Sequence, residues 1–200
     1  MATLTRPPAP GPLGSTRTPH PSSPGLRRLH GAAVVRIGFG LLWAADATFK
    51  WLPGFIHGQT IGADLGAAAT VHTPVIHQWL DFWNTVGSAH PMLFAVGTAI
   101  VESLIALGLI FGAFSNLVFV GSAIFSLGIW SSAEAFGLPW SPGTTDPGTS
   151  IGYVFASLAL FYAVAGATWS LDSRIRPKLG RLRRLSSRVP EAAEPTGIDA

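Results

Sequence analysis

The sequence contains no cysteine in its 200 residues. This absence excludes disulfide bonds, thiolate-ligated zinc, iron–sulfur clusters and covalently attached c-type haem. Charged residues are also scarce, at 12% of the chain against roughly 25% in soluble proteins, whereas 48% of the residues are hydrophobic. The composition is typical of a membrane protein, and any redox chemistry has to use groups other than thiols.

Lys and Arg are almost absent from the centre of the chain. Of the thirteen, four precede residue 31, seven follow residue 173, and none lies between residues 51 and 173. Positive residues near the ends of membrane spans stay in the cytoplasm, so this distribution predicts that both termini are cytoplasmic. The net charge of +3 therefore reflects membrane topology, because the positive residues lie at the two ends of the chain. We expect the lipid bilayer as the partner of the protein and no binding of nucleic acid.

Four apolar runs of about 20 residues are each long enough to cross a hydrocarbon core of about 30 Å. They are residues 32–52, 92–114, 117–136 and 151–171. Each is expected to be a helix, because open strand edges in lipid leave backbone amides unpaired. An even number of spans agrees with two cytoplasmic termini. We therefore expect an all-α protein, a four-transmembrane-helix bundle, multi-pass in the cell (inner) membrane.

The rest of the chain divides around this bundle. Residues 1–30 hold seven prolines among Gly, Ser and Thr and predict a disordered cytoplasmic tail. Residues 31–171 form the predicted transmembrane domain, and residues 172–200 a basic cytoplasmic tail. Between the first two spans, residues 73–86 combine Trp and Phe with aliphatic side chains over a stretch too short to span. This pattern predicts an extracytoplasmic interfacial helix between helices 1 and 2.

Five ionisable side chains lie inside the predicted spans, where each costs ~2.5–3.5 kcal/mol to insert. They are Arg36, Asp46, Lys50, Glu102 and Glu134. Such groups usually face other protein groups or a water-filled cavity. Two arrangements of the five side chains agree with the sequence. One is a proton-competent pocket facing outward. The other is a structural network, in which Asp46 and Glu134 neutralise Lys50 while Glu102 pairs with Arg36.

The charge count favours the pocket, because three carboxylates against two cations leave one surplus acid. One face of the first helix, an arc of roughly 80°, carries Arg36, Trp43, Asp46 and Lys50. This face must point inward, because it holds all the charged side chains of the helix. Lys50 and Glu134 are expected at matching depth. The candidate catalytic residues are therefore Lys50, Asp46, Glu134 and Glu102. No metal site is expected, because the outer histidines lack helical ligand spacing and the nearest two, His72 and His77, are five residues apart.

Several short motifs lie in the predicted spans and in the loop before the last span. They are Arg36-Ile-Gly-Phe-Gly, Asp46-Ala-Thr-Phe-Lys50, Val101-Glu102-Ser103, Glu134-Ala-Phe-Gly137-Leu-Pro139, Pro142-Gly143-Thr-Thr-Asp146-Pro-Gly148 and Tyr153. Together they resemble the DoxX/DoxD family of small four-helix membrane proteins, which includes the DoxD-type subunit of thiosulfate:quinone oxidoreductase. The resemblance implies an inner-membrane subunit linked to quinone and sulfur-compound oxidation and assembled with a partner subunit of a redox complex.

On this resemblance we expect a subunit of a quinone-linked oxidoreductase, with thiosulfate or a related sulfur compound as substrate at the outer face. Quinone would be the electron acceptor, with no haem or iron–sulfur cluster. The candidate quinone contacts are Arg36, Trp43, Trp130 and Tyr153. Two alternatives are a non-catalytic membrane scaffold for a soluble redox enzyme, docked through the basic tail, and a small-solute or proton carrier. A homo-oligomer is compatible with all three.

Overall fold

The computed structural model describes residues 24–140 and 146–188, and every regular element in these two stretches is a helix. The longer helices are α1 (Pro24–Lys50), α3 (Gln59–Ala68), α4 (Ile76–Ala89), α5 (Pro91–Phe111), α6 (Ser115–Ser131) and α7 (Thr149–Tyr162). The short ones are α2 (Pro53–Ile56), η1 (Ala135–Gly137), α8 (Asp172–Ile175), η2 (Arg176–Lys178) and η3 (Gly180–Leu185). The all-helical prediction is therefore confirmed for the described residues.

Two helices, α1 and α5, are long and apolar enough to cross a membrane. Helices α6 and α7 are apolar but shorter, at 17 and 14 residues. The predicted spans at 117–136 and 151–171 are thus interrupted by turns. After α6 the chain enters the one-turn helix η1, and after α7 it runs through turns and bends from residue 163 to residue 171.

The first helix begins earlier than the composition predicts. Residues 24–30, placed in the disordered tail, are the first two turns of α1, while residues 1–23 of that predicted tail lie outside the described residues. Long-range contacts explain the extension. The His30 ring stacks on Trp169 with centroids 4.9 Å apart, and the Thr168 hydroxyl donates a hydrogen bond to the Leu29 carbonyl at 3.1 Å.

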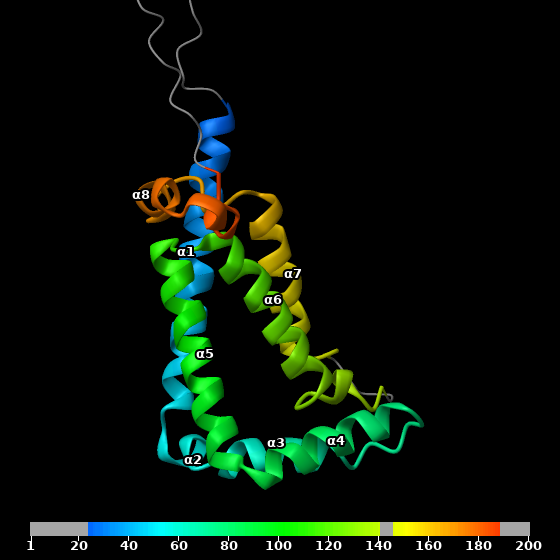
Figure 1. Cartoon of the computed structure of the whole chain (residues 1–200). Helices are drawn as coiled ribbons and strands as arrows, with labels where there is room; N and C mark the ends of the chain where they lie inside the picture. Colours follow the sequence, from blue (N-terminus) through cyan, green and yellow to red (C-terminus); the bar gives the residue numbers. More distant parts are fainter. Residues whose placement is uncertain (1–23, 141–145, 189–200) are drawn as a thin grey trace, which may run out of the picture.

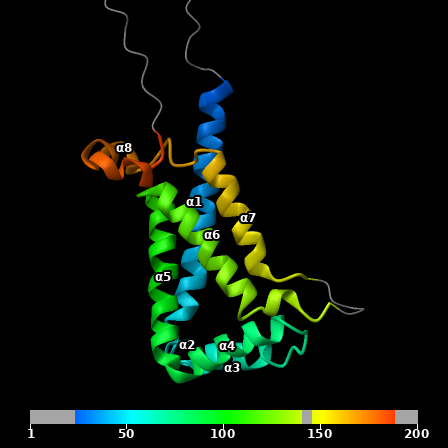
Figure 2. The same cartoon turned by 45° about the vertical axis from the view of Figure 1, so that its right-hand side comes forward.

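The four longest apolar helices form two antiparallel pairs. Helix α1 packs along α5, and α6 packs along α7 (Figures 1 and 2). The pairs converge at the end where α5 turns into α6 and diverge toward the other end, so that they enclose a wedge (Figure 1). The main hydrophobic core fills the converging part. Its buried residues are Phe39, Trp43, Ile105, Ala106, Leu109, Phe119, Leu160 and Ala165.

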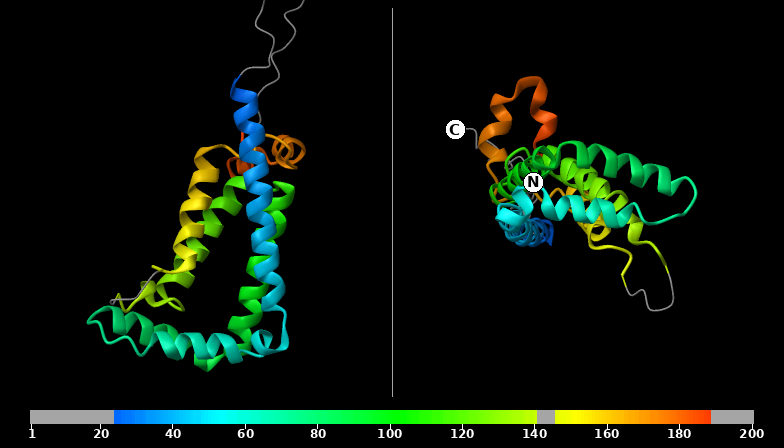
Figure 3. Two further views of the ribbon diagram at one scale, coloured as in Figure 1. Left: turned by 180° about the vertical axis from the view of Figure 1, so that it is seen from behind. Right: turned by 90° about the horizontal axis from the view of Figure 1, so that it is seen from below.

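Helices α3 and α4 lie side by side across the open end of the wedge (Figures 1 and 3). Helix α4 begins and ends three residues later than the helix predicted over residues 73–86, whereas α3 was not predicted. The two helices reach η1 through a second buried cluster of Ala68, Leu80 and Ala135. The Trp79 indole N–H also donates to the Ser131 carbonyl at 3.0 Å. This bridge joins the two helix pairs at the end where they diverge.

The outward faces of all four long apolar helices expose large hydrophobic side chains. One from each helix illustrates the pattern: Val35 is 61% exposed, Leu104 62%, Leu117 50% and Phe155 67%. The inward faces carry small polar groups instead, such as the Ser122 and Ser157 hydroxyls, which are buried and 2.9 Å apart between α6 and α7. Apolar outer faces with small polar groups inside are typical of helices that pack together in a membrane.

Candidate functional site

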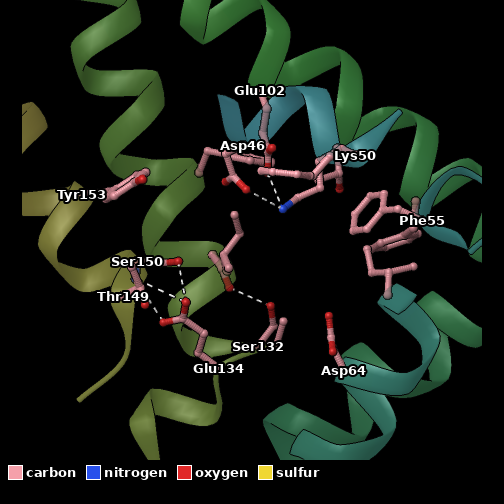
Figure 4. A pocket seen from close by; sticks show the side chains of 18 of the residues that line it. Asp46, Lys50, Phe55, Asp64, Glu102, Ser132, Glu134, Thr149, Ser150 and Tyr153 are labelled. Atoms are coloured by element: carbon pink, nitrogen blue, oxygen red, sulfur yellow. Dashed lines mark hydrogen bonds and ion pairs between the residues drawn. The ribbon is translucent and has the colours of Figure 1, made fainter. Parts of the chain in front are cut away.

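A cavity of about 960 Å³ occupies the wedge between the two helix pairs. Each helix from α1 to α7 contributes side chains to its lining. The bridge of α3 and α4 forms its floor, and the four long apolar helices form its walls. Figure 4 shows the charged and hydroxyl side chains that point into it. All four candidate catalytic residues, Lys50, Asp46, Glu134 and Glu102, line this one cavity.

Lys50 is the cation of the cavity and the last residue of α1. Its ammonium nitrogen lies 3.0 Å from Asp46 Oδ1, one turn earlier on the same helix, and 3.9 Å from Glu102 Oε1 on α5. It also lies 5.1 Å from the centre of the Phe55 ring, within the range of a cation–π contact. One ammonium group therefore serves two carboxylates and an aromatic face (Figure 4).

Glu102 is fully buried, and both of its carboxylate oxygens lack a hydrogen-bond partner among the described residues. The helix brings it there because Ala95, Ala99 and Ala106 share its face and are buried, which lets α1 approach α5 closely. A buried carboxylate normally has its oxygens hydrogen-bonded, since leaving a polar group unpaired is costly. Glu102 is therefore the group in the cavity that most needs a partner.

Glu134 has a different set of partners from the predicted ones. Its carboxylate accepts a hydrogen bond from the Ser150 backbone N–H at 3.1 Å and another from the Ser150 hydroxyl at 2.8 Å. Ser150 is the second residue of α7, so Glu134 places negative charge on the positive end of that helix. The structure thus pairs Lys50 with Asp46 and Glu102, and Glu134 with the start of α7.

An aromatic cluster forms one wall of the cavity. Trp43 is 1% exposed, and the Tyr153 ring packs edge-on against it with centroids 5.2 Å apart. Phe125 completes the wall at 6.3 Å from Trp43. The Trp43 indole N–H is buried without a hydrogen-bond partner among the described residues. Two of the four predicted quinone contacts, Trp43 and Tyr153, therefore line the cavity.

The other two predicted quinone contacts, Arg36 and Trp130, do not line it. Arg36 is buried at the converging end, where its guanidinium donates to the carbonyls of Ala165 at 2.9 Å and Trp169 at 2.6 Å. The alternative in which Arg36 pairs with Glu102 is therefore wrong. Arg36 instead binds backbone carbonyls in the turns after α7, which are not used in helical hydrogen bonds. The Trp130 indole N–H donates to the Pro147 carbonyl at 2.7 Å and holds the loop before α7.

Among the lining residues that sequence reasoning missed, Asp64 and Phe55 bear on the electrostatics of the cavity. Asp64 lies on α3, which was not predicted as an element, although an acid without a nearby Lys or Arg in an apolar segment was a usable signal. The apolar surroundings raise the pKa of the Asp64 carboxyl above its usual value, and the positive charge of Lys50 lowers it in part. With Asp64, the cavity holds four carboxylates against one ammonium group.

The histidines do not assemble a metal centre in the part of the chain that the structure describes, where no three His, Asp or Glu side chains gather as ligands. His72 and His77 come nearest, with their rings edge-on at 4.9 Å. Asp146 accepts a hydrogen bond from the Gly148 N–H at 2.8 Å and shapes the turn just before α7.

Comparisons of the chain with models of protein families, with curated proteins and with solved structures found no match. The resemblance to the DoxX/DoxD family consequently stays a prediction from the motifs.

Proposed function

We propose that the protein is a multi-pass inner-membrane protein in which α1, α5, α6 and α7 all cross the bilayer and both termini face the cytoplasm. The apolar outward faces of all four helices support this placement, as does the concentration of Lys and Arg at the converging end. The shorter α6 and α7 would be completed by non-helical segments. Such backbone is tolerated at membrane depth where protein covers it, and Ala165 and Ala167 after α7 are buried.

In this setting the cavity is proposed to bind a quinone as the electron acceptor of an oxidoreductase complex. The observation that carries the proposal is the buried Glu102, which has no hydrogen-bond partner among the described residues and lies 3.9 Å from Lys50, in a cavity that also has an aromatic wall. A quinone suits such a site because its ring packs on aromatic side chains while its two oxygens need polar partners. Lys50 Nζ and the unpaired Trp43 N–H are donors in reach of the cavity.

A quinone takes up two electrons and two protons to become a quinol. Glu102 and Lys50 are placed to hold protons at the polar end of the cavity, and Asp64 on α3 extends the acidic groups toward the outer side. The chain has no cysteine to hold an electron-carrying cluster, so the electrons are assigned to a partner subunit. This role agrees with the motif resemblance to the DoxX/DoxD family.

The charge of the cavity limits where a sulfur compound can react. Thiosulfate and related sulfur oxyanions are negatively charged, and four carboxylates against one ammonium would repel them. We therefore assign any sulfur chemistry to the partner subunit rather than to this cavity. The neutral quinone remains the ligand that the cavity suits.

The test is quinone retention by the purified protein. The chain, extracted in mild detergent, is expected to carry quinone detectable by mass spectrometry, or to bind an added short-chain quinone with quenching of tryptophan fluorescence. Glu102→Gln is expected to weaken binding of the reduced form, the quinol, about tenfold, because a quinol hydroxyl can donate a buried hydrogen bond to the charged carboxylate whereas a quinone oxygen only accepts. Asp81→Asn is the matched control, because Asp81 is an exposed acid on α4 outside the cavity lining. Unchanged quinol binding in Glu102→Gln would contradict the proposal.

A small-solute or proton carrier is the second candidate, favoured by the excess of acid in the cavity. Four carboxylates around one ammonium group would attract a cation or relay protons. Proteoliposomes distinguish the two functions. Proton or cation flux that depends on Glu102, in a protein that retains no quinone, would favour the carrier. A stable complex with a soluble enzyme, without quinone binding and without flux, would favour the third alternative, a non-catalytic membrane scaffold.

A further inference from the structure

The basic segment after α7 is anchored to the bundle. Its first acid, Asp172, is fully buried, and its carboxylate accepts hydrogen bonds from the backbone N–H groups of Ser115 at 3.1 Å and Ser187 at 2.8 Å. One side chain thus ties both ends of residues 172–187 to the start of α6. Figures 1 and 3 show α8 and the following turns lying across the converging end of the helices.

Asn116 adds a second anchor at the same place. Its side-chain amide donates to the carbonyls of Arg184 and Ser186, both at 3.1 Å, and its oxygen accepts from the Ser187 hydroxyl at 3.0 Å. A tail that acts only through its total charge does not need a defined conformation, since diffuse attraction to an anionic surface depends on charge number and distance. The anchors therefore call for another explanation.

The anchored segment encloses a recess of about 240 Å³ between α8, η2 and η3. Its lining residues are Ser173, Arg176, Pro177, Gly180 and Arg183, none of them acidic. Gly180 has a φ of +49°, a left-handed conformation that glycine adopts without strain, and it reverses the chain between η2 and η3. This turn is what brings Arg183 to the same recess as Arg176.

The recess is strongly positive and incompletely paired. Residues 172–188 contain seven Lys and Arg against one acid, Asp172, which does not line the recess and whose Oδ2 accepts the two anchoring hydrogen bonds. Arg176 Nε is buried and has no hydrogen-bond partner among the described residues. Arg guanidinium groups bind phosphate oxygens through parallel charge-assisted hydrogen bonds.

We infer that this recess is a phosphate-binding site, in which Arg176 and Arg183 hold a phosphate group. The ligand is either the headgroup phosphate of an anionic phospholipid or a soluble phosphate. The first source rests on the membrane placement proposed above, because only then does the converging end of the bundle lie at a lipid surface. The second does not rest on it, and neither depends on quinone binding.

The test uses the full-length protein, purified in detergent and delipidated, and native mass spectrometry to count bound ligand. The probes are short-chain phosphatidylglycerol, phosphatidylcholine and inorganic phosphate. The wild-type protein is expected to bind phosphatidylglycerol or inorganic phosphate. The double variant Arg176→Gln/Arg183→Gln is expected to bind the same probe at least about tenfold more weakly, the factor for one lost charge-assisted hydrogen bond.

The matched control is Arg174→Gln/Arg181→Gln, which removes the same charge from exposed positions of the same segment outside the recess. It is expected to retain most of the binding. Binding of phosphatidylglycerol alone identifies a lipid site, and binding of inorganic phosphate identifies a soluble one. Equal losses in the two double variants would overturn the inference in favour of diffuse charge, and so would the absence of binding by every probe. Arg183→Gln alone, at an exposed side chain, repeats the test if the double variant fails to fold.

Discussion

Lys50 is the residue on which the electrostatics of the cavity depend. It is the ammonium group within reach of both Asp46 and Glu102, and its side chain is 21% exposed, so water screens it only in part. We predict that Lys50→Met costs about 1–3 kcal/mol of stability and abolishes quinone binding, because two carboxylates are left facing each other without a cation. Thermal unfolding in detergent and quinone titration measure the two effects.

Lys50→Arg is the informative companion to that variant. It restores the charge, but a planar guanidinium does not fit a site shaped around a compact ammonium between a carboxylate and the Phe55 ring. We expect stability close to wild type with weaker quinone binding. Wild-type quinone binding in Lys50→Met would remove Lys50 from the proposed site.

Glu134 is predicted to contribute to stability through its contact with α7. Glu134→Ala removes both hydrogen bonds to Ser150 and is expected to cost about 1 kcal/mol, as the loss of a helix N-terminal cap does. Glu134→Gln keeps an acceptor oxygen and is expected to lose only the charge–dipole part, about 0.3–1 kcal/mol. Thermal melting of the two variants separates them, and equal destabilisation would show that the carboxylate is not acting as a cap.

Asp64 gives a prediction for pH dependence. Its pKa is raised in the folded protein, so between the ordinary Asp value near 4 and the raised value the folded state binds more protons than the unfolded state. The contribution of Asp64 to the free energy of unfolding therefore falls as the pH rises from the ordinary Asp value to the raised pKa. Relative to wild type, Asp64→Asn is expected to gain stability progressively over the window and to show no further change above it. A stability difference that is constant with pH would contradict this.

Among the elements, the anchored segment 172–188 is the one that depends most on a single side chain. Asp172→Asn keeps the size of Asp172 but weakens two charge-assisted hydrogen bonds at a fully buried position beside Arg36. We predict a loss of about 2–3 kcal/mol and release of the segment. Limited proteolysis after the arginines of the segment measures the release. Asp146→Asn, at an exposed acid before α7, is the control and should leave the cleavage pattern unchanged.

For the molecule as a whole, the proposed topology places the α3–α4 bridge outside and the anchored segment inside. Single cysteines at Ser88 and Ser173 test this without background, because the chain has none of its own and both positions are exposed. In intact cells an impermeant thiol reagent is expected to label Ser88→Cys and to label Ser173→Cys only after permeabilisation. Labelling of Ser173→Cys in intact cells would reverse or disprove the proposed orientation.

The candidate site could be predicted in part. Lys50, Asp46, Glu102, Glu134, Trp43 and Tyr153 share one cavity, as expected from polar residues that have to face inward in apolar helices. Arg36 and Trp130, predicted for the same site, do not line this cavity, because helical periodicity gives the face of a residue but not which neighbour meets that face at a given height. Asp64 was missed because its helix has a weak amphipathic pattern.

The sequence by itself determined the helical character of the described chain, the positions of the long apolar helices and the separation of its charges. These features follow from local composition and the 3.6-residue period, which require no knowledge of distant contacts. Only the tertiary structure decided that the helix pairs diverge around a cavity, that Lys50 serves Glu102 while Glu134 caps α7, and that the basic segment folds back onto Asp172. Each of these three features brings together residues that are far apart in the chain. Whether such residues come into contact depends on helix packing angles and turns, which local sequence patterns do not encode.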